Sequence, residues 1–278
     1  MKKENIDIKS KGDSEMKKSF LTIVLLMLVI PTLAMAEHFW VGVFGKGTPY
    51  TDQSFISNTK LTQFNRSIEK EWENGFDIID IEYGDDRWMA ISAKGTDYTQ
   101  QVYLHKRNWK KFEAAVENYK KEGFVLVNVE NGKGYWLGIL AKGSRYSDVV
   151  LKNIRYEEDF LKEISAQWKK GYHLLDVEPA EGTWVGLFAK NTGFVEQAYH
   201  SVDDWDGVPK IIEEKWAEGF RLNSIEYGGG KWFCIFVKDG KKPEGSYISN
   251  SEIPTFRKAM HKQWSKGYHL IDLAHGRD

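Results

Sequence analysis

Apolar and polar positions along this chain repeat with a period of 48 residues. One recurring segment is a mostly apolar run that opens with Trp and closes with Lys, at Trp40, Trp88, Trp136, Trp184 and Trp232 and at Lys46, Lys94, Lys142, Lys190 and Lys238. A second series consists of glycines that are each followed by Phe or Tyr, namely Gly75, Gly123, Gly171, Gly219 and Gly267. Self-similarity at such a period indicates a repeat architecture.

The period divides residues 37–278 into five units that form one domain. The units are repeat 1 (37–84), repeat 2 (85–132), repeat 3 (133–180), repeat 4 (181–228) and repeat 5 (229–276). Each unit has the pattern strand, strand, helix, strand. The fold class that we expect is therefore α+β, built from five 48-residue ββαβ repeats.

The first strand of each unit is apolar on both faces, as in WVGVFGK and WLGILAK, which is typical of a central strand covered on both sides. A turn rich in Gly and Thr follows, and then a short second strand such as VYLH. This order predicts that the first two strands of each unit form a hairpin.

The helix has apolar positions three or four residues apart, as at Leu61, Phe64, Ile68 and Trp72, so we expect one buried face. The recurring glycine lies three residues after the last apolar position. A left-handed residue belongs there, and only Gly adopts that conformation without strain. The third strand, for example FDIIDIEYG, follows at once.

The two ends of the domain predict that the units close into a ring. An open array needs polar end units, yet the first unit keeps Trp40 and Trp72 and the last keeps Trp232 and Trp264. The chain also begins on a first strand and stops on a third strand. We therefore expect the last strand, about 268–275, to pair with the first, about 39–46, in a closed ring of the propeller kind.

Two resemblances extend this picture. Five ββαβ units in a ring are similar in topology to the α/β-propeller, or pentein, architecture. The sequence resembles an uncharacterised repeat of bacterial proteins that also lies C-terminal to the catalytic domain of plant casein-kinase-I-like kinases. The match is a Gly-[Thr/Ser]-x-[Tyr/Phe]-x-x-Gln-x-[Tyr/Phe] pattern followed by Trp-x-x-Gly-[Tyr/Phe] and Trp, represented by Gly95, Thr96, Tyr98, Gln101 and Tyr103 and by Trp72, Gly75, Phe76 and Trp88. The third unit has Val149 for Gln and the fifth lacks the Tyr, and the resemblance implies no activity.

The amino-terminal residues predict export. Lys17 and Lys18 precede an apolar run from Phe20 to Ile30, and the triplet Ala34, Met35 and Ala36 follows. This is typical of a signal peptide, here with a polar extension over residues 1–36, that is cleaved near Ala36. Either Met1 or Met16 is the start. We expect a periplasmic or secreted protein with no membrane segment after cleavage.

Charge and cysteine content exclude some classes of partner and leave the ligand open. The chain has 39 Lys and Arg residues against 40 Asp and Glu, so nucleic acid is not expected as a partner. The single cysteine, Cys234, cannot form an internal disulfide. No cofactor motif is present, and no cofactor is expected.

The Trp, Lys and Gly positions that recur in every unit are interpreted as structural. Trp residues suit a buried core. For the Lys positions, two alternatives remain. The five ammonium groups can surround an anion, or they can form ion pairs with acidic residues of the third strands, of which we expect the second. Those acids are Asp80, Asp176, Asp272, Glu82, Glu130, Glu178 and Glu226.

Residues that break the repeat are the candidates for catalysis. Cys234 stands where other units have Gly or Ala, and pentein enzymes use a Cys, but a mid-strand thiol is normally buried and inert. His269 and His275 lie on one face of the last strand and Asp272 lies on the other, with His38 near them if the ring closes. A shared metal is therefore not expected, and no catalytic residue is assigned.

The remaining candidates lie on the turns after the first strands. They are Tyr50, Tyr98, Tyr146 and Phe194, with Gln53, Gln101 and Gln197. Either these side chains bind a ligand such as a glycan or an envelope protein, or they hold the turn in place. The leading hypothesis is an exported, non-enzymatic binding or scaffold module with several independent loop sites. The alternative is a pentein-like or other hydrolytic enzyme with an asymmetric site.

Overall fold

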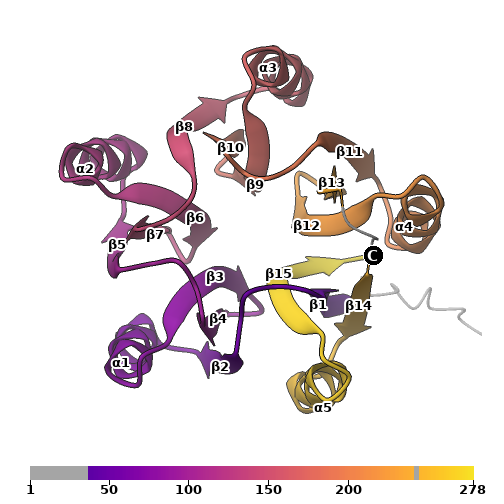
Figure 1. Ribbon diagram of the computed structural model, residues 1–278, viewed down its shortest axis with the longest axis horizontal. Coiled ribbons are helices and arrows are strands. Elements are labelled where there is room, and N and C mark those ends of the chain that lie inside the picture. Colours follow the sequence, from indigo (N-terminus) through magenta and orange to yellow (C-terminus); the bar gives the residue numbers. More distant parts are fainter. Residues whose placement is uncertain (1–36, 241–243) are drawn as a thin grey trace, which may run out of the picture. The chain divides into compact units, whose positions relative to one another are not determined.

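The structure is a computed structural model that describes residues 37–240 and 244–278. The expected signal peptide, with Met16 and Ala36, lies outside the described residues. The described chain is mixed α+β, with five helices and five three-stranded sheets, and Figure 1 shows a helix on the outer side of each sheet. No helix in these ranges is long and apolar enough to cross a membrane.

Each unit forms two strands, a helix and a third strand, as its sequence predicts. The elements of the first two units are β1 (His38–Gly45), β2 (Asp52–Asn58), α1 (Leu61–Glu73), β3 (Asp77–Gly84), β4 (Arg87–Lys94), β5 (Gln100–Lys106), α2 (Trp109–Lys121) and β6 (Val125–Gly132). Those of the third and fourth are β7 (Tyr135–Lys142), β8 (Ser147–Ile154), α3 (Glu157–Lys169), β9 (His173–Ala180), β10 (Thr183–Lys190), β11 (Glu196–Val202), α4 (Gly207–Ala217) and β12 (Arg221–Gly228). The fifth unit has β13 (Lys231–Lys238), β14 (Gly245–Asn250), α5 (Ile253–Trp264) and β15 (His269–Arg277).

The recurring glycines end the helices as predicted. Gly75 follows α1 with φ of +77°, and its N–H donates to the Trp72 carbonyl oxygen at 3.0 Å. The corresponding glycines after the other helices also have positive φ, between +77° and +87°. A residue with a Cβ is strained in this conformation, which explains why the position is Gly in all five units.

The predicted hairpin between the first two strands of a unit is wrong. In each sheet the middle strand comes from a neighbouring unit, and the strand orders are β2-β4-β3, β5-β7-β6, β8-β10-β9, β11-β13-β12 and β14-β1-β15. The turn after each middle strand therefore crosses to the next sheet. A strand that is apolar on both faces needs a partner at each edge, and the second and third strands of the preceding unit supply both.

The fifth sheet joins the two ends of the domain. β1 lies between β14 and β15 and is antiparallel to both, with Gly42 opposite Ile248 on one side and Leu273 on the other. The predicted pairing of the last strand with the first is therefore confirmed.

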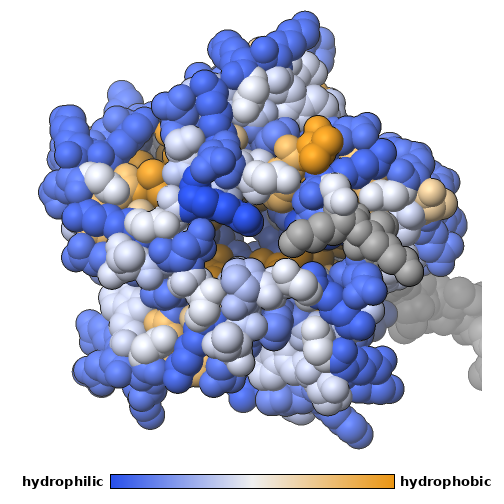
Figure 2. All heavy atoms as spheres, viewed as in Figure 1, coloured by the Kyte–Doolittle hydropathy of each residue, from blue (hydrophilic) through white to orange (hydrophobic). Residues whose placement is uncertain are grey.

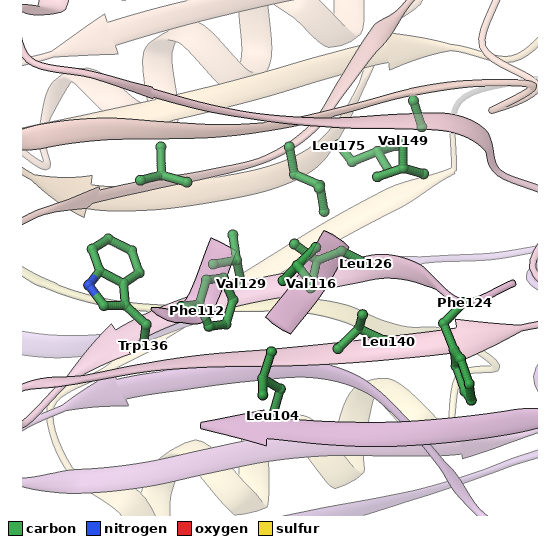
Figure 3. Close-up of a cluster of buried hydrophobic side chains, with 13 residues drawn as sticks. Leu104, Phe112, Val116, Phe124, Leu126, Val129, Trp136, Leu140, Val149 and Leu175 are labelled. Carbon is green, nitrogen blue, oxygen red and sulfur yellow. The ribbon is translucent and has the colours of Figure 1, made fainter. Parts of the chain in front are cut away.

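Most of the hydrophobic core lies between sheets. Figure 3 shows one cluster in which Leu126 of the β5-β7-β6 sheet lies opposite Val149 and Leu175 of the next sheet. Trp136 and Phe112 belong to the same cluster. The alternating faces of a middle strand explain this arrangement. In β4, Trp88 and Ala90 pack with α1, whereas Met89 and Ile91 pack in the cluster of Phe256, which belongs to the helix α5 that contacts the β14-β1-β15 sheet. All five recurring Trp residues that open the middle strands are buried.

The third strands lie against one another. β3 contacts β6 and β15, β9 contacts β6 and β12, and β12 contacts β15. Glycines permit this close approach, because a Cβ added at Gly132 would overlap Tyr83 of the neighbouring strand, and one at Gly84 would overlap His275. The contact between β3 and β15 thus repeats the contact between β6 and β3.

The pairing of β1 with β15 predicts an engineered disulfide. His38 and Arg277 are exposed and face each other, and the Asp278 N–H donates to the Glu37 carbonyl oxygen at 3.1 Å. Such a pair has Cα atoms about 4.5 Å apart, within the range for a disulfide. In a Cys234→Ala background, His38→Cys with Arg277→Cys should form an intramolecular disulfide that stabilises the fold by about 2–4 kcal/mol.

Denaturant unfolding with and without reductant measures the effect of this disulfide. The two single cysteine variants serve as controls and should unfold like the parent. Failure of the double variant to crosslink under oxidising conditions would contradict the pairing.

Candidate functional site

A cavity of about 730 Å³, here called the central pocket, is lined by residues from all five units. They belong to the turns after the middle strands and to the third strands, which lie nearest the centre in Figure 1. Figure 2 shows a hollow at the middle of one face, bordered mainly by hydrophilic residues. The central pocket is therefore assembled by the packing of the sheets and does not exist within any single unit.

Aromatic side chains from four units line the central pocket. They are the sequence candidates Tyr50, Tyr98, Tyr146 and Phe194, which the structure brings together in one cavity. The local cause is a turn in which Thr or Ser lies two residues earlier. The Tyr98 N–H donates to Thr96 Oγ1 at 3.3 Å, and the Tyr146 N–H donates to Ser144 Oγ at 3.2 Å. These four side chains, expected on separate loops, therefore line the same cavity.

The candidate glutamines hold neighbouring strands together. Gln101 Oε1 accepts hydrogen bonds from Trp72 Nε1 and from the Ile78 N–H, both at 2.8 Å, and Gln101 Nε2 donates to the Ile78 carbonyl oxygen at 2.7 Å. Gln197 makes the matching bonds with Trp168 and Leu174, and Gln53 bonds to both backbone groups of Leu270. Because the side-chain amides of the three Gln residues are occupied by these bonds, the structure favours the alternative in which they hold the chain in place and do not bind a ligand.

The buried end of the central pocket is polar. One position of each third strand forms it, namely Asp80, Asn128, Asp176, Ser224 and Asp272, and each of the five is at least nine-tenths buried. These five residues, here called the floor, are bonded across the strands. Asp80 accepts from the Leu273 N–H at 2.7 Å, Asp176 from the Val129 N–H at 3.3 Å and Asp272 from the Ile225 N–H at 2.9 Å.

The sequence interpretation assigned these carboxylates to ion pairs with the recurring lysines, and that assignment is wrong. Each lysine instead places its Nζ over the aromatic ring that follows the helix-ending glycine, for example Lys94 over Phe76 at 4.4 Å and Lys238 over Phe220 at 4.1 Å. Three lysines also pair with a carboxylate at or just before the second strand, as Lys238 does with Glu196 at 2.8 Å. Among residues 37–240 and 244–278, the buried third-strand carboxylates form no ion pair with these five lysines.

Burial changes the charge of the floor. It raises the pKa of Asp176 to about 6, against which hydrogen bonds from Val129 and Val177 act. The pKa of Asp80 is raised well above its usual value, first by burial and then by the charges of Asp272 and Asp176. The pKa of Asp272 is raised by burial and by Asp176.

A second buried row of carboxyl groups lies two residues further along the third strands. It consists of Glu82, Glu130, Glu178 and Glu226, with Ala274 at the fifth position. Burial is the main cause that raises the pKa of each of these four groups. These carboxyl groups therefore stay protonated in the folded protein at pH values at which they are ionised in the unfolded chain.

Charged groups of both signs line the remainder of the central pocket. Arg145 is exposed, and its guanidinium lies 5.9 Å from the ring centre of Tyr146. Arg221 is largely buried, lies 3.6 Å from Asp239 and bonds to Asn223 at 3.1 Å. Neither arginine was predicted as a site residue, because Arg occurs at each of these positions in only one unit. The only sequence signal for them is that they differ from the corresponding residues of the other units.

The residues considered for catalysis or metal binding do not form one cluster, although His38 lies near His275 as expected. Cys234 is fully buried in β13, and burial raises its pKa. His269 bonds to Thr48, and Asp272 lies in the floor. The ring centre of His275 lies 4.5 Å from that of Trp40, in a tilted contact, and 5.5 Å from that of His38. Within residues 37–240 and 244–278, no three His, Cys, Asp or Glu side chains are placed to hold a metal ion.

The raised carboxyl pKa values predict a pH dependence of stability that one substitution isolates. The pKa of Asp176 is about 6 in the folded protein and about 3.9 in the unfolded chain. Between these pH values the folded state keeps a proton that the unfolded state has released, so the free energy of unfolding falls as the pH rises from 4 through 6. Asp176→Asn should therefore be more stable than the parent at pH 8, by about 2–3 kcal/mol. The difference should vanish near pH 4.

Denaturant unfolding across pH 4–8 checks this prediction. Glu69→Gln, which removes an exposed carboxylate on α1, is the matched control and should show no such trend. A difference between Asp176→Asn and the parent that stays constant with pH would contradict the raised pKa.

The burial of Cys234 predicts an unreactive thiol. A thiol reagent should modify the native protein only after denaturant is added, because neither access nor thiolate is available in the folded state. Cys234→Ala should leave any activity intact. Rapid labelling of the native protein would contradict the buried position and favour an enzymatic role.

Comparison with known proteins gives a family without an assigned activity. No curated protein matches the chain. A family model described as a domain of unknown function, DUF7477, matches residues 103–278, from within β5 to the residue after β15. Since this match covers more than half of the chain, the protein belongs to the DUF7477 family.

Proposed function

We propose that the five sheets close into a ring of the α/β-propeller kind. Three observations support the closure. β1 completes the sheet of β14 and β15. Five buried clusters connect each sheet with the next, including the fifth with the first. The Leu273 N–H bonds to Asp80 as the Val129 N–H bonds to Asp176, so the contact across the two chain ends repeats an internal one. The kinship with the repeat of plant casein-kinase-I-like kinases belongs to the same proposal.

We also propose that the protein is an exported, non-enzymatic binding module that acts in the periplasm or outside the cell, after cleavage near Ala36. The observation that carries this proposal is the central pocket. Its volume of about 730 Å³ lies within the usual range for ligand sites of about 300–1,000 Å³. Aromatic faces beside a few fixed polar groups are the usual composition of such sites, and they suit a glycan or another small polar ligand.

A hydrolytic enzyme is the second candidate, and one observation favours it. Asp176 lines the central pocket with a pKa of about 6, a value suited to a general acid near neutral pH. Its oxygen Oδ2 is already bonded to the backbone of Val129. We therefore rank binding first, and hydrolysis of chromogenic glycosides that is lost in Asp176→Asn would reverse this order.

The shared pocket predicts that single aromatic substitutions strongly weaken binding. In a screen of glycans and small polar compounds, ligands should raise the melting temperature of the parent protein. Tyr98→Ala should reduce their affinity about tenfold, because it removes one wall of the pocket. Tyr50→Ala and Tyr146→Ala should act similarly.

Tyr156→Ala is the matched control, because Tyr156 is 60% exposed and does not line the central pocket. It should leave affinity unchanged. Ligand binding that survives all three pocket substitutions, or that depends equally on Tyr156, would refute the central pocket as the binding site.

A further inference from the structure

The floor of the central pocket offers hydrogen-bond acceptors in excess of donors. Asp80 already accepts two bonds, from the Leu273 N–H and from Asn128 Nδ2 at 2.7 Å. Asn128 is 95% buried, since 5% of it is exposed, and its amide oxygen Oδ1 has no hydrogen-bond partner. An unpaired buried acceptor is destabilising, and a donor group on a ligand removes this cost.

The carboxyl groups of the floor lack a cation among the described residues. No ion pair is formed by Asp80, Asp176 or Asp272, whose bonds come from backbone and neutral polar groups. Buried carboxylates are normally paired with a cation or kept neutral by a proton. The central pocket gives an outside cation direct access to them, because the same residues line it.

The walls favour a cation with an alkyl or ring body. Tyr50, Tyr98 and Tyr146 lie close enough for the charge of one phenolate to raise the pKa of another. Aromatic rings attract ammonium groups and pack against CH groups. The aromatic walls and the carboxyl groups of the floor thus both favour the cationic end of a ligand.

We propose that the central pocket binds small molecules through a primary ammonium group, which enters first and donates to Asn128 Oδ1, Asp176 and Asp272. This inference rests on the proposed binding function and names its ligand class. A primary ammonium fits better than a quaternary one, because the floor needs N–H donors. Arg145 also lines the central pocket and is exposed, so we expect the far end of the ligand to be neutral or anionic.

Matched pairs of compounds test the ammonium requirement. Glucosamine, lysine and 1,4-diaminobutane are each titrated calorimetrically into the purified protein at pH 7.5, beside the corresponding N-acetylated compound. At least one amine should bind about tenfold or more tightly than its acetylated partner, since hydrogen bonds between charged groups are stronger than those between neutral groups. Glucosamine or lysine should bind more tightly than 1,4-diaminobutane, because the second ammonium group of the diamine would be repelled by Arg145.

Substitution of the floor tests the location. Asp176→Asn should weaken amine binding about tenfold, and the fold tolerates Asn at this position because the second unit has Asn128 there. Asp272→Asn is a second variant with the same expected result. Glu69→Gln, on the outer surface of α1, should bind the amine like the parent.

The outcomes separate this inference from the proposed function. Binding of a neutral compound that Tyr98→Ala weakens but Asp176→Asn does not would retain the binding function and overturn the ammonium requirement. Equal binding of every amine and its acetylated partner would also overturn it. If none of the three amines binds, the inference is wrong. If no compound in the wider screen depends on Tyr98, the proposed function fails as well.

Discussion

Backbone hydrogen bonds between a middle strand and two strands of another unit hold every sheet of this protein together. In the fifth sheet, this constraint places β1 between β14 and β15, so residues near the two ends of the domain share one ladder. A unit of 48 residues cannot complete a sheet alone. Each unit therefore depends on its neighbour for a central strand, and stability belongs to the assembly more than to any single repeat.

The central position of this strand determines the residues around it. Both of its faces are buried, so one face packs on the helix of its own sheet and the other on the preceding sheet. The small residue near its middle follows from the first contact. A Cβ at Gly186 would lie 2.7 Å from a ring carbon of Phe160 in α3, which leaves no room for a larger side chain.

The same packing concentrates carboxyl groups at the centre. Around the neighbouring third strands the floor reads Asp80, Asn128, Asp176, Ser224 and Asp272, so neutral residues separate most of the acids. Five positions cannot alternate completely, and Asp80 and Asp272 remain neighbours where β3 meets β15. This proximity is one cause of the raised pKa of Asp80. A polar floor beneath aromatic walls is the arrangement on which the binding proposals depend.

The sequence by itself determined the local structure. The 48-residue period, the helical stripe ending at residues such as Trp72, and the positive φ of Gly75 all follow from short-range patterns. Only the tertiary structure decided which copy of a strand pairs with which, because the five copies of each strand are nearly equivalent in pattern. It also decided the site. Tyr50 and Tyr146 are 96 residues apart in sequence, and their placement in one pocket follows from the packing of separate sheets, which local spacing does not encode.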